Sequence, residues 1–195
     1  LALQRSHTVA AEMAERSIRA MQNALLSISA YTPELAQSIR DDEDACDHYE
    51  DIIGTYLVQL SSHSLSDGES QESTELLKTI GDFERISDHA VNVLESAEEL
   101  QSKKLSFSPA AMAEYQTLAR ATRRILHLSL DSFRQDDPVQ AAQVEPLEQV
   151  IDTLKEELRT RHILRMRRGQ CSIEAGFVWV DLLTDLERTS DHCSN

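Results

Sequence analysis

The stretch from Asp82 to Asn92 reads DFERISDHAVN, and the stretch from Asp185 to Asn195 reads DLERTSDHCSN. The two stretches lie 103 residues apart and share seven of their eleven residues. Most of the shared residues are polar, whereas a repeat that served only core packing would preserve leucines and other apolar side chains. Because an internal repeat dictates the architecture of a chain, the sequence predicts two similar units. The repeated polar residues predict that each unit carries a site.

The hydrophobic pattern and the capping residues predict six main helices. Apolar residues recur at three- and four-residue spacing near the N-terminus, and Thr32-Pro33, Ser108-Pro109, Asp137-Pro138 and Ser172 are typical helix starts. We expect Gly169 to end the fifth helix, and Pro146 to kink it or restart it at Glu145. The expected helices cover residues 2–30, 33–63, 71–103, 109–134, 138–168 and 172–195.

The order of two helices followed by a motif helix occurs twice. Pro33 and Pro138 are 105 residues apart, close to the 103 of the motif. No segment shows the alternation of a strand. The sequence therefore predicts an all-α fold of two pseudo-symmetric three-helix bundles side by side, over residues 1–104 and 105–195. The third helix of the second unit is expected to be truncated by the end of the chain.

The charge of the chain excludes some partners. With 34 acidic and 19 basic residues, the formal net charge is −15. A nucleic-acid-binding protein needs a basic face, so no nucleic acid partner is expected. Metal cations fit this charge better, and a solvated acidic surface is the simpler alternative.

Cysteine usage and apolar content narrow the class further. The three cysteines form no CxxC motif, so no disulfide framework is expected, and each is interpreted as a small buried side chain. No apolar run approaches the roughly 20 residues that a membrane span needs. The chain begins at Leu1 and ends inside a motif, which we interpret as a fragment of a longer protein.

Four Glu-x-x-x-Asp pairs are the candidate metal ligands. Residues at i and i+4 share one helix face, where two like charges repel unless a cation lies between them. About six acidic pairs at this spacing are expected by chance from 34 acids in 195 residues, so a solvated acidic face remains the alternative. Their equivalent places in both units favour metal binding. Within each unit the two pairs should face each other: Glu43/Asp47 with Glu84/Asp88, and Glu148/Asp152 with Glu187/Asp191.

Other repeated residues are expected to assist these carboxylates. Asn92 and Asn195 lie one turn beyond Asp88 and Asp191, so their amide oxygens are predicted to complete the coordination. Each motif histidine lies about 100° around the helix from the neighbouring aspartate, which favours support or packing over direct ligation. The arginines are expected to pair with carboxylates across the bundle. The supporting residues are Asp82, Arg85, His89, Asp185, Arg188 and His192.

A basic cluster precedes Gly169 in this acidic chain. Such charge is favourable at a helix C-terminus, which is the simpler interpretation. The alternative is a docking patch for a membrane surface or an acidic partner. The cluster consists of Arg159, Arg161, Arg165, Arg167 and Arg168.

The two repeats, with Glu-x-x-x-Asp on the second and third helices and D-x-E-R-x-x-D-H-x-x-N on the third, resemble the PhoU family. The stretch from His162 to Asn195, HILRMRRGQCSIEAGFVWVDLLTDLERTSDHCSN, is most similar to the PhoU-like domain that follows the membrane part of bacterial sodium/phosphate cotransporter-family proteins.

The resemblance implies a cytoplasmic, non-enzymatic regulatory domain of phosphate uptake at the inner face of the membrane. It also implies clusters of iron or another hard cation, and a phosphate transporter membrane domain or phosphate-signalling proteins as partners, with homo-oligomerisation as a further option. The alternatives are a free-standing PhoU-type regulator and a metal-free helical interaction module. The positions carried over are Glu43, Asp47, Glu84, Asp88, Asn92, Glu148, Asp152, Glu187, Asp191 and Asn195.

A carboxylate-bridged di-iron enzyme is the competing catalytic class. Such helical bundles carry Glu-x-x-His motifs on facing helices. None of the seven histidines has an acidic residue three positions before it. The sequence therefore predicts no enzyme of this kind.

Overall fold

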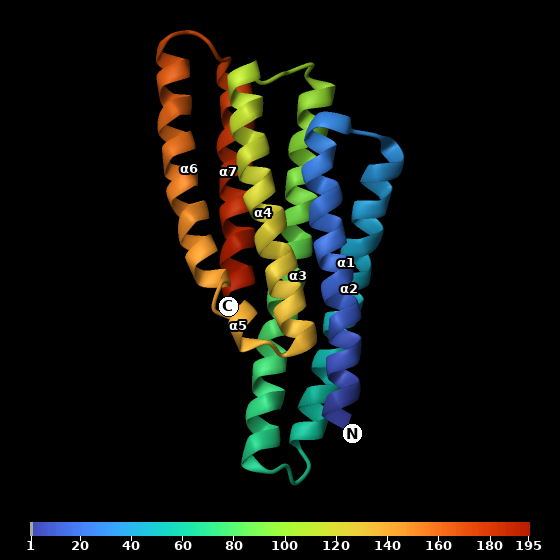
Figure 1. The fold of residues 1–195 in the computed structure, drawn as a ribbon. Helices are drawn as coiled ribbons and strands as arrows, with labels where there is room; N and C mark the ends of the chain where they lie inside the picture. The colour runs from blue at the N-terminus through green and yellow to red at the C-terminus, as the bar shows by residue number, and fades with distance from the viewer. Residues whose placement is uncertain (1) are drawn as a thin grey trace.

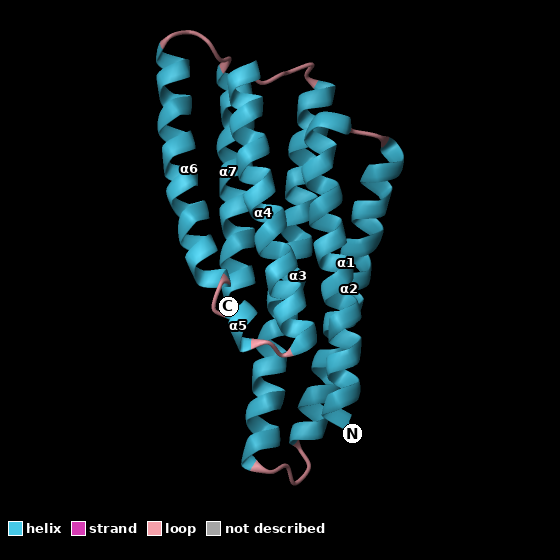
Figure 2. Cartoon of the chain, viewed as in Figure 1, coloured by secondary structure: helices cyan, strands magenta, loops and turns pink. Residues whose placement is uncertain are grey.

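The computed structural model describes residues 2–195, and all regular secondary structure within that range is helical (Figure 1, Figure 2). This confirms the all-α prediction. The helices are α1 (Ala2–Ala30), α2 (Pro33–Ser61), α3 (Asp67–Ser102), α4 (Pro109–Gln135), α5 (Pro138–Ala141), α6 (Val144–Arg167) and α7 (Ile173–Ser194).

The predicted capping residues begin their helices. The side chain of Thr32 accepts a hydrogen bond from the Leu35 amide, and Ser108 and Ser172 accept equivalent bonds at the starts of α4 and α7. Gly169 follows α6 with φ +65, a left-handed conformation that costs glycine little. These local signals explain why the helix starts were predictable from sequence.

Two boundaries differ from the prediction. Helix α3 starts at Asp67 rather than near residue 71, because Ser66 and Glu69 form a reciprocal capping box that draws residues 67–70 into the first turn. The fifth predicted helix is split into α5 and α6, which agrees with the expected restart near Pro146 and differs from it by one residue. Helix α6 restarts at Val144, which places Pro146 in the first turn, where its missing N–H breaks no helical hydrogen bond.

The helices pack as two three-helix units. Helices α1, α2 and α3 contact one another, and α4, α6 and α7 do the same. The units meet where α3 packs against α7 and α1 against α4, while α2 and α6 lie on the outside (Figure 1). One hydrophobic cluster runs through both units and includes Met21, Ile86, Leu118 and Trp179. The motif helices α3 and α7 are therefore held at the centre of the molecule.

One buried carboxylate joins α1 to α2. Asp42 is 1% exposed, and its side chain accepts hydrogen bonds from the Arg19 guanidinium, including one of 2.8 Å from Nε. Arg16 lies 3.5 Å away on the same carboxylate. A buried charge is tolerated only when it is paired in this way. This contact therefore fixes the position of α2 along the axis of α1.

Over residues 2–195, none of the helices is both long enough and apolar enough to traverse a bilayer.

Candidate metal centres

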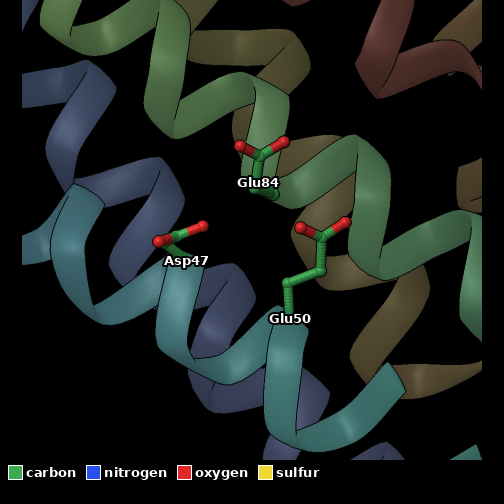
Figure 3. A group of neighbouring side chains, drawn as sticks. All are labelled: Asp47, Glu50 and Glu84. Carbon is green, nitrogen blue, oxygen red and sulfur yellow. The ribbon is translucent and has the colours of Figure 1, made fainter. Parts of the chain in front are cut away.

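In the first unit, α2 directs Asp47 and Glu50 toward Glu84 of α3 (Figure 3). One carboxylate oxygen from each residue lies within 4.8 Å of the other two. Hard cations prefer several oxygen ligands of this type. The three side chains can therefore share a cation between α2 and α3.

The other two predicted carboxylates of this unit lie beside the cluster. Burial, followed by the charge of Asp88, raises the pKa of Glu43 above its ordinary value. The same two causes raise the pKa of Glu84 to about 7. Crowded carboxylates resist ionisation together. The four predicted residues and Glu50 thus form one acidic surface between the two helices.

Glu50 is a site residue that the sequence interpretation missed. It lies three residues after Asp47, and residues at i and i+3 share a helix face as i and i+4 do. Burial and the charge of Asp47 raise its pKa, whereas the positive charge of Arg85 lowers it. A search for acidic pairs at both spacings would have found it.

In the second unit, Glu148 and Asp152 of α6 meet Asp191 of α7. One oxygen from each lies within 4.8 Å of the others. Burial and the neighbouring carboxyl group of Asp152 raise the pKa of Glu148 to about 7. Asp152 Oδ1 is buried and, among the described residues, has no hydrogen-bond partner. Such an atom is costly to leave without a partner, and a bound cation would satisfy it.

One of the positions at which the two units differ lies beside the acidic clusters. Because the carboxylate pairs of α2 and α6 are 105 residues apart, Glu50 of the first unit corresponds to Lys155 of the second. Lys155 Nζ lies 3.5 Å from Glu187 Oε2. Glu187, predicted as a metal ligand, therefore lies beside a positive charge of its own chain.

The motif histidines and their aspartates connect the two units. His89 Nδ1 lies 2.9 Å from Asp185 Oδ1, and His192 Nδ1 lies 2.9 Å from Asp82 Oδ1. The two imidazoles stack with ring centroids 5.6 Å apart. Each histidine thus contacts the aspartate of the other motif, and the contact is reciprocal.

The two motif asparagines belong to the same interface. Asn92 Nδ2 donates to Asp185 at 3.2 Å, and Asn195 Nδ2 donates to Asp82 at 3.0 Å. They were predicted to complete the metal coordination, and the structure gives them a contact that needs no metal. One face of each motif helix carries the acidic cluster, and another face carries the pairing between units.

The contacts of the motif arginines and of the basic cluster differ from those expected. Among residues 2–195, neither motif arginine forms an ion pair with a carboxylate, although such pairing was expected for both Arg85 and Arg188. In the basic cluster, Arg161 pairs with Glu157 and Glu114. Arg165 donates to Glu114 at 2.8 Å, with only 11% of its side chain exposed. Of the five arginines in the cluster, Arg165 is largely covered, whereas Arg159, Arg161, Arg167 and Arg168 remain exposed.

A family model described as "PhoU domain" matches residues 10–97 and 115–195. The chain is 24% identical over 176 residues to the phosphate-specific transport system accessory protein PhoU homolog 1 of Thermotoga maritima, covering 90% of this chain and 75% of that protein. It is 25% identical over 123 residues to the PhoU homolog of Deinococcus radiodurans, covering 62% of this chain and 55% of that protein.

Two solved structures share the fold. The PhoU structure from Pseudomonas aeruginosa matches with a TM-score of 0.80 at 20% identity, over 100% of this chain and 89% of that one. The phosphate transport system regulatory protein PhoU from Streptococcus pneumoniae matches with a TM-score of 0.86 at 18% identity, over 99% and 90%. None of these four names mentions a sodium/phosphate cotransporter, so they support the family and not the predicted subgroup.

Proposed function

Because the chain belongs to the PhoU family, we propose that it is a non-catalytic regulator of phosphate transport whose acidic clusters bind metal ions. The Thermotoga maritima relative is named as an accessory protein of a phosphate-specific transport system, and the Streptococcus pneumoniae structure is named as a regulatory protein. These names agree with the prediction of a domain that is not an enzyme.

The observation that carries the metal proposal is the arrangement of the clusters. Each unit brings three carboxylates from two helices within 4.8 Å, and in the second unit the buried Asp152 Oδ1 has no hydrogen-bond partner among the described residues. Iron or another hard cation would supply the positive charge that these oxygens lack. The residues proposed to hold it are Asp47, Glu50 and Glu84 in the first unit and Glu148, Asp152 and Asp191 in the second, with Glu43, Asp88 and Glu187 beside them.

A cation bound in either cluster would regulate the protein by holding two of its helices together. In each unit the cluster bridges an outer helix and a motif helix, so carboxylate repulsion opposes close packing there. A cation that binds the closed arrangement better than an open one shifts the equilibrium toward the closed arrangement. We propose that this change is communicated to a phosphate transport protein or a phosphate-signalling protein at the inner face of the membrane.

Two kinds of parent protein fit this role. The stretch from His162 to Asn195 favours the PhoU-like domain of a sodium/phosphate cotransporter, whereas the named relatives favour an accessory protein of a separate transport system. We take the second as the better supported. Co-purification with the transporter subunits of a phosphate-specific system supports this choice, and binding only to a sodium/phosphate cotransporter contradicts it.

The metal proposal is tested by elemental analysis of protein purified without a histidine tag, before and after chelation. We expect bound metal in the wild type and loss of the second-unit metal in Asp152→Asn with Asp191→Asn. The matched control is Glu145→Gln with Glu174→Gln, which changes two exposed acids on the same helices. Equal metal content in all three proteins would place the metal outside the second cluster, and no metal in the wild type would leave the metal-free helical module as the better description.

The regulatory role is tested in a bacterium that lacks its own PhoU. We expect the wild-type chain to restore controlled phosphate uptake, and the cluster variant to restore less at an equal protein level. Equal restoration by both would separate the regulation from the metal.

A further inference from the structure

A cavity lies at the opposite end of the second unit from the acidic cluster. It has a volume of about 290 Å³ and lies between the α3–α4 link, the end of α6 and the start of α7. The side chains of His162, Arg165 and Trp179 line it, together with Lys104 and Phe107. Small-molecule sites in proteins are concave and carry a few converging polar groups of this kind.

Within residues 2–195, two of these lining residues have a buried donor without a hydrogen-bond partner, Arg165 Nη2 and Trp179 Nε1. The Nε2 atom of His162 also has no partner there, but it faces Gly176 of α7. His162 is 2% exposed and Trp179 is 1% exposed. Guanidinium and indole nitrogens can only donate hydrogen bonds. Leaving such buried donors unpaired costs free energy, so the group that completes this cavity must be an acceptor.

The positively charged side chains around the cavity favour an anion as the ligand. The guanidinium of Arg165 is held by Glu114 through Nη1, which leaves Nη2 free to donate to a ligand. Lys104, at the exposed edge, adopts φ 54 in the left-handed region. That conformation ends α3, where Leu105 N donates to Leu100 O at 2.9 Å, and it leaves the Lys104 ammonium at the edge of the cavity.

The walls of the cavity are packed firmly. The Trp179 ring lies 5.1 Å from the Phe107 ring and 5.5 Å from the Arg165 guanidinium carbon, measured to the indole centroid. Gly176 lets α7 approach closely, because a Cβ there would lie 3.0 Å from His162 Nε2. The donors are therefore positioned before any ligand arrives, which reduces the entropic cost of binding.

We propose that this cavity binds a phosphate group, either as inorganic phosphate or as part of a small phosphomonoester. Because the donors lie on different walls of the cavity, a suitable ligand has several acceptor oxygens on one central atom. A tetrahedral phosphate dianion has these oxygens, whereas chloride has none. Along the helices, His162 lies about 15 Å from Asp152 and Trp179 about 18 Å from Asp191. The site is thus separate from the metal clusters, and it would stand if no metal bound.

The single tryptophan of the chain gives a direct test. The indole N–H of Trp179 produces one side-chain signal of its type in a proton–nitrogen correlation spectrum. In chelator-treated protein, we expect this signal to shift saturably with inorganic phosphate or glycerol 3-phosphate, and not with chloride at the same ionic strength. The arm with the tighter response identifies the source of the phosphate group. A signal that does not move, or that moves equally with chloride, overturns the proposal.

Three variants test whether phosphate binds in this cavity. Lys104→Gly removes the ammonium and suits the left-handed backbone, and we expect it to weaken phosphate binding about five- to tenfold. Arg165→Lys keeps the charge and removes the Nη2 donor, and it should weaken binding by a similar factor. Lys103→Ala, an exposed neighbour that does not line the cavity, is the matched control and should bind as the wild type does. Wild-type affinity in both Lys104→Gly and Arg165→Lys would place phosphate elsewhere and refute the assignment.

Discussion

Replacing Lys155 by glutamate should make the stability of the second unit depend more strongly on bound metal. Its Nζ lies 3.5 Å from Glu187 Oε2, and the two side chains are only 20% and 21% exposed. At this distance and an effective dielectric constant near 20, Coulomb's law gives about 4–5 kcal/mol of attraction. Solvent screening and desolvation reduce the net contribution to about 1–2 kcal/mol.

The substitution Lys155→Glu removes this attraction and adds a like charge beside Glu187. We expect the free energy of unfolding of chelator-treated protein to fall by about 2–3 kcal/mol, which lowers Tm by about 4–12 °C for a chain of this size. The assay is thermal unfolding followed by circular dichroism. Lys78→Glu, which makes the same charge change at an exposed place on α3, is the control and should change Tm much less.

Added metal should reverse the effect. With a glutamate at position 155, the second unit gains the counterpart of Glu50, and a cation at 100 times its Kd adds about 2.7 kcal/mol of stability. The reciprocal change Glu50→Lys should stabilise the chelated protein and reduce the metal response of the first unit. An unchanged Tm of Lys155→Glu in chelator, with no larger gain from metal, would refute the idea that this lysine offsets part of the negative charge of the second unit.

Three further outcomes are expected. Asp42→Asn should lower the free energy of unfolding by about 1–3 kcal/mol in urea titrations, because it removes the buried charge that the arginines of α1 hold; full stability would contradict the role of this ion pair. The pKa values near 7 of Glu84 and Glu148 mean that the folded chain holds more protons than the unfolded chain between about pH 4.5 and 7. The chelated protein should therefore lose stability as pH rises through that window and keep a constant penalty above it, and Tm values at pH 5 and 8 check the sign. His89→Ala and His192→Ala should each cost about 1–2 kcal/mol, and the double variant should cost less than their sum because the rings stack on each other; strict additivity would argue against that coupling.

Local signals made most of the helices predictable. Thr32, Ser108 and Ser172 each cap the helix that follows, and their effect depends only on neighbouring residues. The start of α3 was missed although Ser66 and Glu69 are equally local, because the serine- and glycine-containing stretch around Gly68 resembles a turn. The prediction treated the glycine as part of a turn and did not use the capping box that starts the helix.

The site was predictable only in part, because periodicity gives the angle of a side chain around its helix and not the helix that it faces. Asp47 and Glu84 were assigned to facing positions since both belong to acidic pairs. Asn92 was assigned to the same cluster, but its amide donates to Asp185 on the other motif helix. The repeat did not predict a role for Lys155, because a repeat indicates what the two units share and this position is one at which they differ.

The stacked imidazoles of His89 and His192 have a mechanical consequence. The two histidines occupy equivalent places in the two units and contact each other, with ring centroids 5.6 Å apart. A twofold axis relating the units would therefore pass between the two rings. When one body turns against another about an axis, each atom moves in proportion to its distance from that axis. The histidine pair is therefore a pivot that a small turn would hardly disturb, whereas the outer helices α2 and α6 would act as the long arms of a lever. A modest rotation at the centre would appear as the largest displacement at the two outer edges of the molecule.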